Sequence, residues 1–221
     1  MGFFETIINF FQTGGTFMYP ILIVFTIGCA IAIERWIKLI NVRNANSSIW
    51  SEIHPVLEEG KFDNARKMIA ENTSAIGKLL EMGLARQGSV RRRDDIEIAM
   101  EESMMEIIPQ LEKRTPYVAL FANIATLLGL LGTIMGLIEA FSAVANADPA
   151  EKADLLSASI SVAMNTTAFG LIAAIPLLLM HAMISSRTSE IIDGMEMVSV
   201  KTLNLIADFT KRQSELAAKN G

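Results

Sequence analysis

The sequence predicts an all-α membrane protein in which three transmembrane helices carry long cytoplasmic helical extensions, with the N-terminus outside and the C-terminus in the cytoplasm. Of its 221 residues, 51% are hydrophobic and only 19% are charged, and the mean hydropathy is positive. The apolar residues are gathered in blocks instead of being spread out by periodicity, which is typical of membrane proteins. No segment shows the alternation of a β-strand.

The first block predicts a transmembrane helix over residues 17–40. It reads FMYPILIVFTIGCAIAI and ends in ERWIKL, a charged and aromatic boundary of the kind found at a membrane–water interface. Residues 1–16 are expected to form a periplasmic interfacial helix, with Phe3–Phe11 as its amphipathic part and Gly14-Gly15 breaking it before the span. This opening has no basic region and no small-residue cleavage site, so we do not expect a cleaved signal peptide.

Two further blocks predict transmembrane helices over residues 116–145 and 155–184, joined by a periplasmic loop at 146–154. Both exceed the roughly 20 residues that cross a hydrocarbon core of about 30 Å. They are therefore expected to tilt, or to project beyond the bilayer against other protein.

The distribution of Lys and Arg gives the orientation. Residues 1–16 contain none and the 146–154 loop contains only Lys152, whereas most of the basic residues lie between Arg43 and Arg114 or after Ser185. Because positive charge marks the cytoplasmic side, the N-terminus and the loop face outward.

The segment 41–115 is expected to be cytoplasmic and helical. Its apolar spacing predicts a helical pair turned at Gly60 and another helix over about 74–86. The tail 185–221 should continue the third span as an amphipathic helix.

A further helix in this segment is expected to begin after the Arg-Asp cluster at 91–95. Asp94 could cap it, with Glu97 three residues on. Pro109 and Pro116 are expected to kink it.

Small and hydroxyl-bearing residues form one stripe on each of the last two spans. The second span carries Thr126, Gly129, Thr133, Gly136 and Ala140, and the third carries Ser159, Ala163, Thr166, Thr167, Gly170, Ala173 and Ala174. Such stripes fit two interpretations: close helix packing, or a polar path along the helices. In addition, Pro176 leaves the carbonyl group near Ile172 without its helical partner, which protein or water must satisfy.

Several classes of function are disfavoured by the composition. The net charge of −5 argues against nucleic-acid binding, and the single cysteine, Cys29, excludes a disulfide within the chain. We find no catalytic constellation, so the protein is not expected to be an enzyme.

From Leu155 to Met180 there is no Asp, Glu, Lys or Arg. An ion-translocating site needs a group that binds and releases the ion, so a partner would have to supply the acid.

Three stretches resemble the MotA/TolQ/ExbB proton channel family, and the ExbB/TolQ branch in particular. ATLLGLLGTIMGLIEAF (125–141) is similar to the family's second-span signature, TTAFGLIAAIP (166–176) to its third-span signature, and AIAIERWIKL (30–39) to its first-span exit.

The resemblance implies a subunit of a motor driven by an ion-motive force, located as a multi-pass protein in the bacterial inner (cytoplasmic) membrane. Five copies would surround a dimer of an ExbD/TolR-like single-span protein that supplies a membrane Asp. Flow of H⁺ or Na⁺ past that Asp would drive periplasmic work such as TonB-dependent uptake, passed on through a TonB/TolA-like protein. No bound cofactor is implied.

The resemblance also assigns candidate residues. Thr133 and Thr167 match the threonines of the second-span and third-span signatures, and the small and kinking positions that would serve helix packing and face the partner are Gly129, Gly132, Gly136, Gly170 and Pro176. Thr166 and Thr126 join the candidate ion pathway because they add further hydroxyl groups.

Two positions depart from the family pattern: Thr126 stands where proline is frequent, and Val162 where a glutamate is common. Because hard cations prefer oxygen ligands, the extra hydroxyls suggest sodium coupling as a hypothesis. Three other interpretations remain open: a TolQ-like envelope or gliding motor subunit, a passive membrane scaffold, and a self-sufficient channel.

Overall fold

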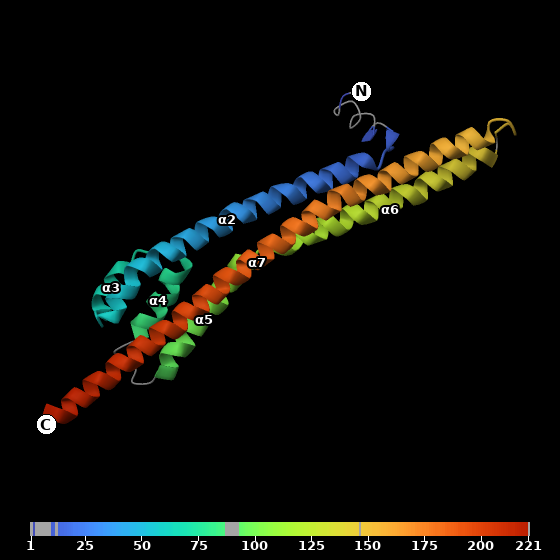
Figure 1. The fold of residues 1–221 in the computed structure, drawn as a ribbon. Helices are drawn as coiled ribbons and strands as arrows, with labels where there is room; N and C mark the ends of the chain where they lie inside the picture. The colour runs from blue at the N-terminus through green and yellow to red at the C-terminus, as the bar shows by residue number, and fades with distance from the viewer. Residues whose placement is uncertain (1, 3–9, 12, 87–92, 146, 221) are drawn as a thin grey trace. The chain divides into compact units, whose positions relative to one another are not determined.

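The computed structural model describes residues 2, 10–11, 13–86, 93–145 and 147–220, and this part of the chain is almost entirely helical and contains no strand (Figure 1). The helices are α2 (Met18–Glu58), α3 (Phe62–Ile69), α4 (Ala75–Arg86), α5 (Arg93–Glu112), α6 (Thr115–Ala145) and α7 (Lys152–Asn220). Three helical runs among the described residues are long and apolar enough to cross a membrane: α2, α5 together with α6, and α7. The prediction of an all-α chain with three helices able to span a membrane is therefore confirmed.

The chain forms two compact units. The first, here called the membrane unit, comprises residues 1–35 and 114–184, and the second, the extension unit, comprises residues 36–113 and 185–221. Helices α2 and α7 contribute to both units without a break. The sequence analysis expected the tail to continue the third span as one helix, as α7 does. It ended the first span at residue 40, whereas α2 continues to Glu58, because no Pro or Gly interrupts the chain at that boundary.

Within the membrane unit, α6 and α7 run side by side from the link at residues 146–151 (Figure 1). Their backbones touch. A Cβ atom added to Gly170 would lie 2.8 Å from the carbonyl oxygen of Ala125 and 3.0 Å from Cα of Gly129. Helix α2 packs on the pair at Gly28, where a Cβ atom would lie 2.8 Å from the Leu177 side chain and 3.3 Å from Phe121. Small residues thus allow the close packing that holds membrane helices together.

The interruption between α5 and α6 lies at Lys113–Arg114, between the two prolines that were expected to kink the chain. Arg114 has a left-handed φ of 68°, and its guanidinium group donates to both carboxylate oxygens of Glu34 on α2, at 3.0 and 2.8 Å. Pro109 lies inside α5, and Pro116 lies in the first turn of α6, where its missing N–H needs no helical partner.

Of the predicted interfacial helix, residues 3–9 lie outside the described residues, while Phe10 and Phe11 are helical. Both rings contact Phe169 of α7, with ring centroids 6.4 and 5.7 Å apart. The expected break follows, since Gly15 has a left-handed φ of 77°.

In the extension unit, the turn predicted at Gly60 is present, with a φ of 72° between α2 and α3. Phe209 of α7 lies against this glycine and meets Phe62 edge-on at 5.5 Å. A side chain at Gly60 would collide with the Phe209 ring, so both the φ angle and the packing require glycine.

Helix α4 begins where the sequence placed it, because the Ser74 hydroxyl accepts a hydrogen bond from the Gly77 amide at 3.0 Å. Helix α5 already includes Arg93, so Asp94 lies in its first turn and not at the capping position that was expected. At that position, the negative charge of its carboxylate interacts favourably with the positive end of the helix dipole.

The two glycines of α7 give a matched test of backbone contact. Gly170→Ala should destabilise the protein by about 1–3 kcal/mol, because the methyl group has only backbone to displace. Gly194→Ala should instead stabilise it by about 0.5–1 kcal/mol, since nothing lies within 4 Å and alanine is the better helix former. Thermal unfolding of the purified protein in detergent measures both changes. Equal midpoints for the two variants would contradict the close contact.

Candidate functional site

The candidate site lies beside the backbone contact between α6 and α7, and its centre is a pair of threonine hydroxyls. The glycine contact brings the helices close enough for Thr133 of α6 and Thr167 of α7 to hydrogen-bond to each other directly. Both side chains are half-buried, so the pair lies at the edge of the helix–helix seam.

Each threonine hydroxyl group has a single proton, so the donor and the acceptor of this pair can be assigned. Thr167 Oγ1 donates to the carbonyl oxygen of Gly129 at 2.9 Å, which uses its only proton. Thr133 Oγ1 therefore donates to Thr167, because its distances to the carbonyl oxygens of Gly129 and Ala163, 3.3 and 3.4 Å, are longer. In this arrangement Thr133 keeps both oxygen lone pairs for an outside donor or cation.

Thr166 forms different hydrogen bonds from those of the adjacent Thr167. It is buried, and its hydroxyl oxygen lies 2.5 Å from the carbonyl oxygen of Gly14 and 3.0 Å from that of Val162, one turn earlier in α7. Its single proton serves these carbonyl groups, and its methyl group fills the space left by Gly132. Thr166 therefore ties the N-terminal segment to the helix pair.

Thr126 stands apart from the other threonines. Its side chain is exposed, and its hydroxyl donates to its own helix at the Ala122 carbonyl oxygen, at 3.2 Å. The structure thus brings together two of the four candidate pathway residues, places the third against Gly14, and leaves the fourth on the outer surface of the unit.

The candidate packing residues line the same seam, with one exception. Gly129 and Gly170 form the backbone contact, Gly132 receives Thr166, and a Cβ atom at Gly136 would lie 2.9 Å from that of Ala163. Pro176 is exposed, and α7 continues through it.

The seam contains hydroxyl and carbonyl oxygens but no acid. Glu139, the one acidic residue of α6, is exposed near the C-terminal end of that helix, and α7 has no charged residue between Leu155 and Met180. The described residues contain no group of His, Cys, Asp or Glu side chains that could hold a metal ion. The arrangement can therefore accept and relay hydrogen bonds, but it cannot change its own charge.

The structure adds interactions that the sequence analysis did not find. Arg35 is buried at 1% exposure beside the ion pair between Glu34 and Arg114. The sequence analysis interpreted the ERWIKL stretch as a boundary at the membrane–water interface and did not predict that Arg35 is buried. The hydrogen bond from Thr166 to the Gly14 carbonyl group could not be predicted either, because every residue has a backbone carbonyl group and the sequence does not show which of them accepts from a side chain.

Comparison with known proteins shows which family the chain belongs to. Residues 71–197, more than half of the chain, match the MotA/TolQ/ExbB proton channel family. The chain belongs to this family. The match contains all nine candidate residues, and the similarity is to the ExbB/TolQ branch.

Three relatives show how far the family similarity extends. A putative biopolymer transport protein ExbB homolog of Methanothermobacter thermautotrophicus is 28% identical over 205 residues, which cover 91% of this chain and 71% of the relative. The Tol-Pal system protein TolQ of Haemophilus influenzae is 36% identical over 93 residues, 42% of this chain and 40% of the relative. A biopolymer transport protein ExbB of Vibrio cholerae is 47% identical over 57 residues, 26% and 25% of the two chains.

The placement of the threonines predicts which of them is needed for stability in this ExbB/TolQ-like chain. Thr166→Val should destabilise the protein by about 1–3 kcal/mol, because a valine methyl group replaces the donor to the buried Gly14 carbonyl oxygen. Thr126→Val, which alters an exposed hydroxyl, should stay within about 0.5 kcal/mol of the parent. Thermal unfolding in detergent compares the two, and a Thr166 variant as stable as the Thr126 variant would contradict the tether.

Proposed function

We propose that this chain is an ExbB/TolQ-like subunit of an ion-driven motor in the bacterial inner membrane, which couples ion flow to periplasmic work such as TonB-dependent uptake. In this proposal five copies form a ring around a dimer of an ExbD/TolR-like single-span protein. The N-terminus and the loop at 146–154 face the periplasm, and the extension unit faces the cytoplasm. The observation that carries the proposal is the hydroxyl pair Thr133–Thr167 at the edge of the seam.

The missing acid explains why a partner is needed. Ion translocation requires a group that takes up and releases the ion at membrane depth, and the seam offers only oxygens that stay neutral. A carboxyl group inserted by a second protein would, in its protonated form, donate a hydrogen bond to a free lone pair of Thr133. The ion would then move between that carboxyl group and the hydroxyl pair, and the driving force would be about 2.3 kcal/mol per charge for each 100 mV.

The same reasoning disfavours a self-sufficient channel, because that function would need the titration within this chain. A motor that serves envelope maintenance or gliding, as TolQ-like relatives suggest, differs from the leading proposal only in the process that it drives. A passive scaffold remains the alternative of a different kind, since glycines and self-bonded threonines also pack helices.

Replacing both hydroxyls of the pair separates a motor from a scaffold. In Thr133→Val/Thr167→Val the assembly should still form, because two isosteric apolar groups can replace a bonded pair at little cost in stability. Ion-driven periplasmic work should fall by roughly tenfold or more, since the passing ion loses hydrogen-bonding partners worth about 1–3 kcal/mol.

The matched control is Thr126→Val, which removes an exposed hydroxyl from the same span and should leave the work unchanged. Assembly is measured by co-purification of the chain with its partner, and work by uptake or envelope integrity in cells. Full work in the double variant would favour the scaffold.

We further propose that the coupling ion is the proton. The hypothesis of sodium coupling relied on extra hydroxyls along one path, but Thr166 is buried against Gly14 and Thr126 lies exposed on another part of α6, so neither oxygen lies at the pair. Only two side-chain oxygens then remain at the pair, fewer than the several oxygen ligands that a hard cation prefers.

The choice of ion can be tested in cells or vesicles that hold a proton gradient in a medium free of sodium. We expect the periplasmic work to persist at its normal rate and to stop when a protonophore removes the gradient. Loss of work in the absence of sodium, restored by adding sodium chloride but not potassium chloride, would contradict proton coupling.

A further inference from the structure

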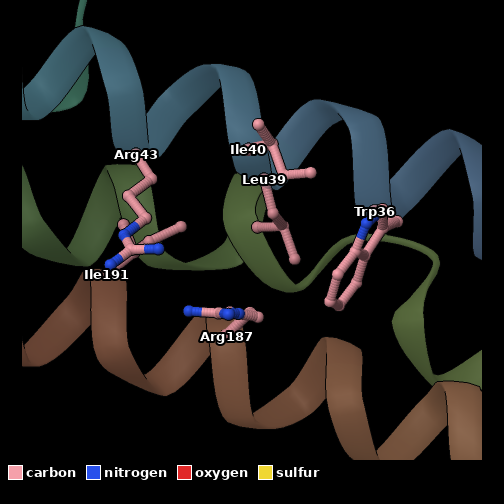
Figure 2. A pocket seen from close by; sticks show the side chains of 6 residues that line it. All are labelled: Trp36, Leu39, Ile40, Arg43, Arg187 and Ile191. Carbon is pink, nitrogen blue, oxygen red and sulfur yellow. The ribbon is translucent and has the colours of Figure 1, made fainter.

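A pocket of about 260 Å³ opens between α2 and α7 within the extension unit, and it combines apolar and cationic side chains (Figure 2). It is lined by Trp36, Leu39, Ile40 and Arg43 of α2 and by Arg187 and Ile191 of α7. Figure 2 shows both guanidinium groups and the indole ring pointing into the space between the two helices. No acidic side chain is among the lining residues.

The two arginines are held differently. The guanidinium group of Arg187 lies 5.9 Å from the centre of the Trp36 ring and forms an ion pair with Glu190 at 2.7 Å. Arg43 is exposed, and within the described part of the chain no ion pair is formed by its guanidinium group. The pocket therefore carries a net positive charge. An arginine guanidinium group can bind a phosphate group with two parallel hydrogen bonds.

The place of the pocket along the helices defines its surroundings. Arg43 follows the first predicted span, which ends at residue 40, and Arg187 follows the third, which ends at residue 184. Trp36 and Ile40 belong to the last turns of the first span, and Leu39 and Ile191 are buried. From these predicted span ends, we place the two arginines at headgroup level and Trp36 and Ile40 on the side of the hydrocarbon, while Ile191 lies beyond Arg187.

We propose that this pocket binds an anionic phospholipid of the leaflet that faces the extension unit. The phosphate lies between Arg43 and Arg187, and the upper acyl chain lies along Ile40 and the Trp36 ring. Charge complementarity supports this occupant, because basic pockets between transmembrane helices on the cytoplasmic side attract anionic headgroups. A soluble phosphate ion would leave the apolar part of the pocket unfilled. The inference depends on the membrane location of the helices and not on the proposed motor.

The chain provides its own reporter for this lipid. It has two tryptophans, Trp36 in the pocket and Trp50 outside its lining, so Trp50→Phe leaves Trp36 as the only indole. The full-length variant is placed in nanodiscs that contain brominated phosphatidylglycerol or brominated phosphatidylcholine, whose bromine atoms quench nearby indole fluorescence. We expect the anionic lipid to quench Trp36 with an apparent affinity on the order of fivefold higher, as one well-placed arginine provides near a membrane surface.

Variants of the charged residues test the assignment in both directions. Arg43→Gln/Arg187→Gln should make the two lipids quench equally, whereas Glu190→Gln should increase the preference, because it removes the carboxylate that competes for Arg187. The control Lys201→Gln/Arg212→Gln removes two exposed charges of α7 away from the pocket and should keep the parental preference.

Any one of three quenching results would overturn the proposal, and a fourth comes from the phosphate experiment below. The three are equal quenching of the parent by the two lipids, a preference that survives in the double arginine variant while its circular dichroism stays native, and a preference unchanged by Glu190→Gln. Inorganic phosphate provides the last arm. It should relieve quenching by phosphatidylglycerol no more than sodium chloride of equal ionic strength does. Stronger relief by phosphate would identify a soluble-anion site and contradict the lipid.

Discussion

The backbone contact between Gly129 and Gly170 is the constraint on which the membrane unit depends. Lipid provides no hydrophobic drive between helices, so α6 and α7 must gain their attraction from close approach. A Cβ atom at either glycine would meet the backbone of the other helix. Only at this separation can Thr133 and Thr167 hydrogen-bond to each other, and the seam then presents the oxygen of Thr133 at its edge. Packing and candidate function thus share one contact.

The candidate site is polar without being ionisable, and this determines what the protein can contribute to the motor that we propose. A hydroxyl pair anchored on the Gly129 carbonyl oxygen can orient a proton or a water molecule, but it keeps the same charge throughout. Thr166 is not part of the pair, and its hydroxyl group instead links the Gly14 backbone to α7. The chain would therefore provide polar groups of constant charge along the ion path, and the change in charge would take place on a second protein.

The sequence predicted elements that depend on local chemistry: the three apolar spans, the turn at Gly60 and the start of α4 at Ser74. It did not resolve which way each threonine faces. Thr166 and Thr167 are one residue apart and differ by about 100° around the helix, so they contact different neighbours. Thr126 and Thr133 share a stripe, but a straight helix drifts by about 20° for every seven residues, and contact between two helices is local. Arg35 was missed because burial of a charged residue depends on tertiary neighbours.

The most direct test of the account is the structure of the assembled complex, purified with its partner and determined by electron cryo-microscopy in a lipid nanodisc. The account predicts that the oxygen atoms of Thr133 and Thr167 face the centre of the assembly, within hydrogen-bonding reach, directly or through one water molecule, of a carboxylate that another chain contributes. A structure in which both threonines face lipid, or in which no acidic helix enters the ring, would contradict it.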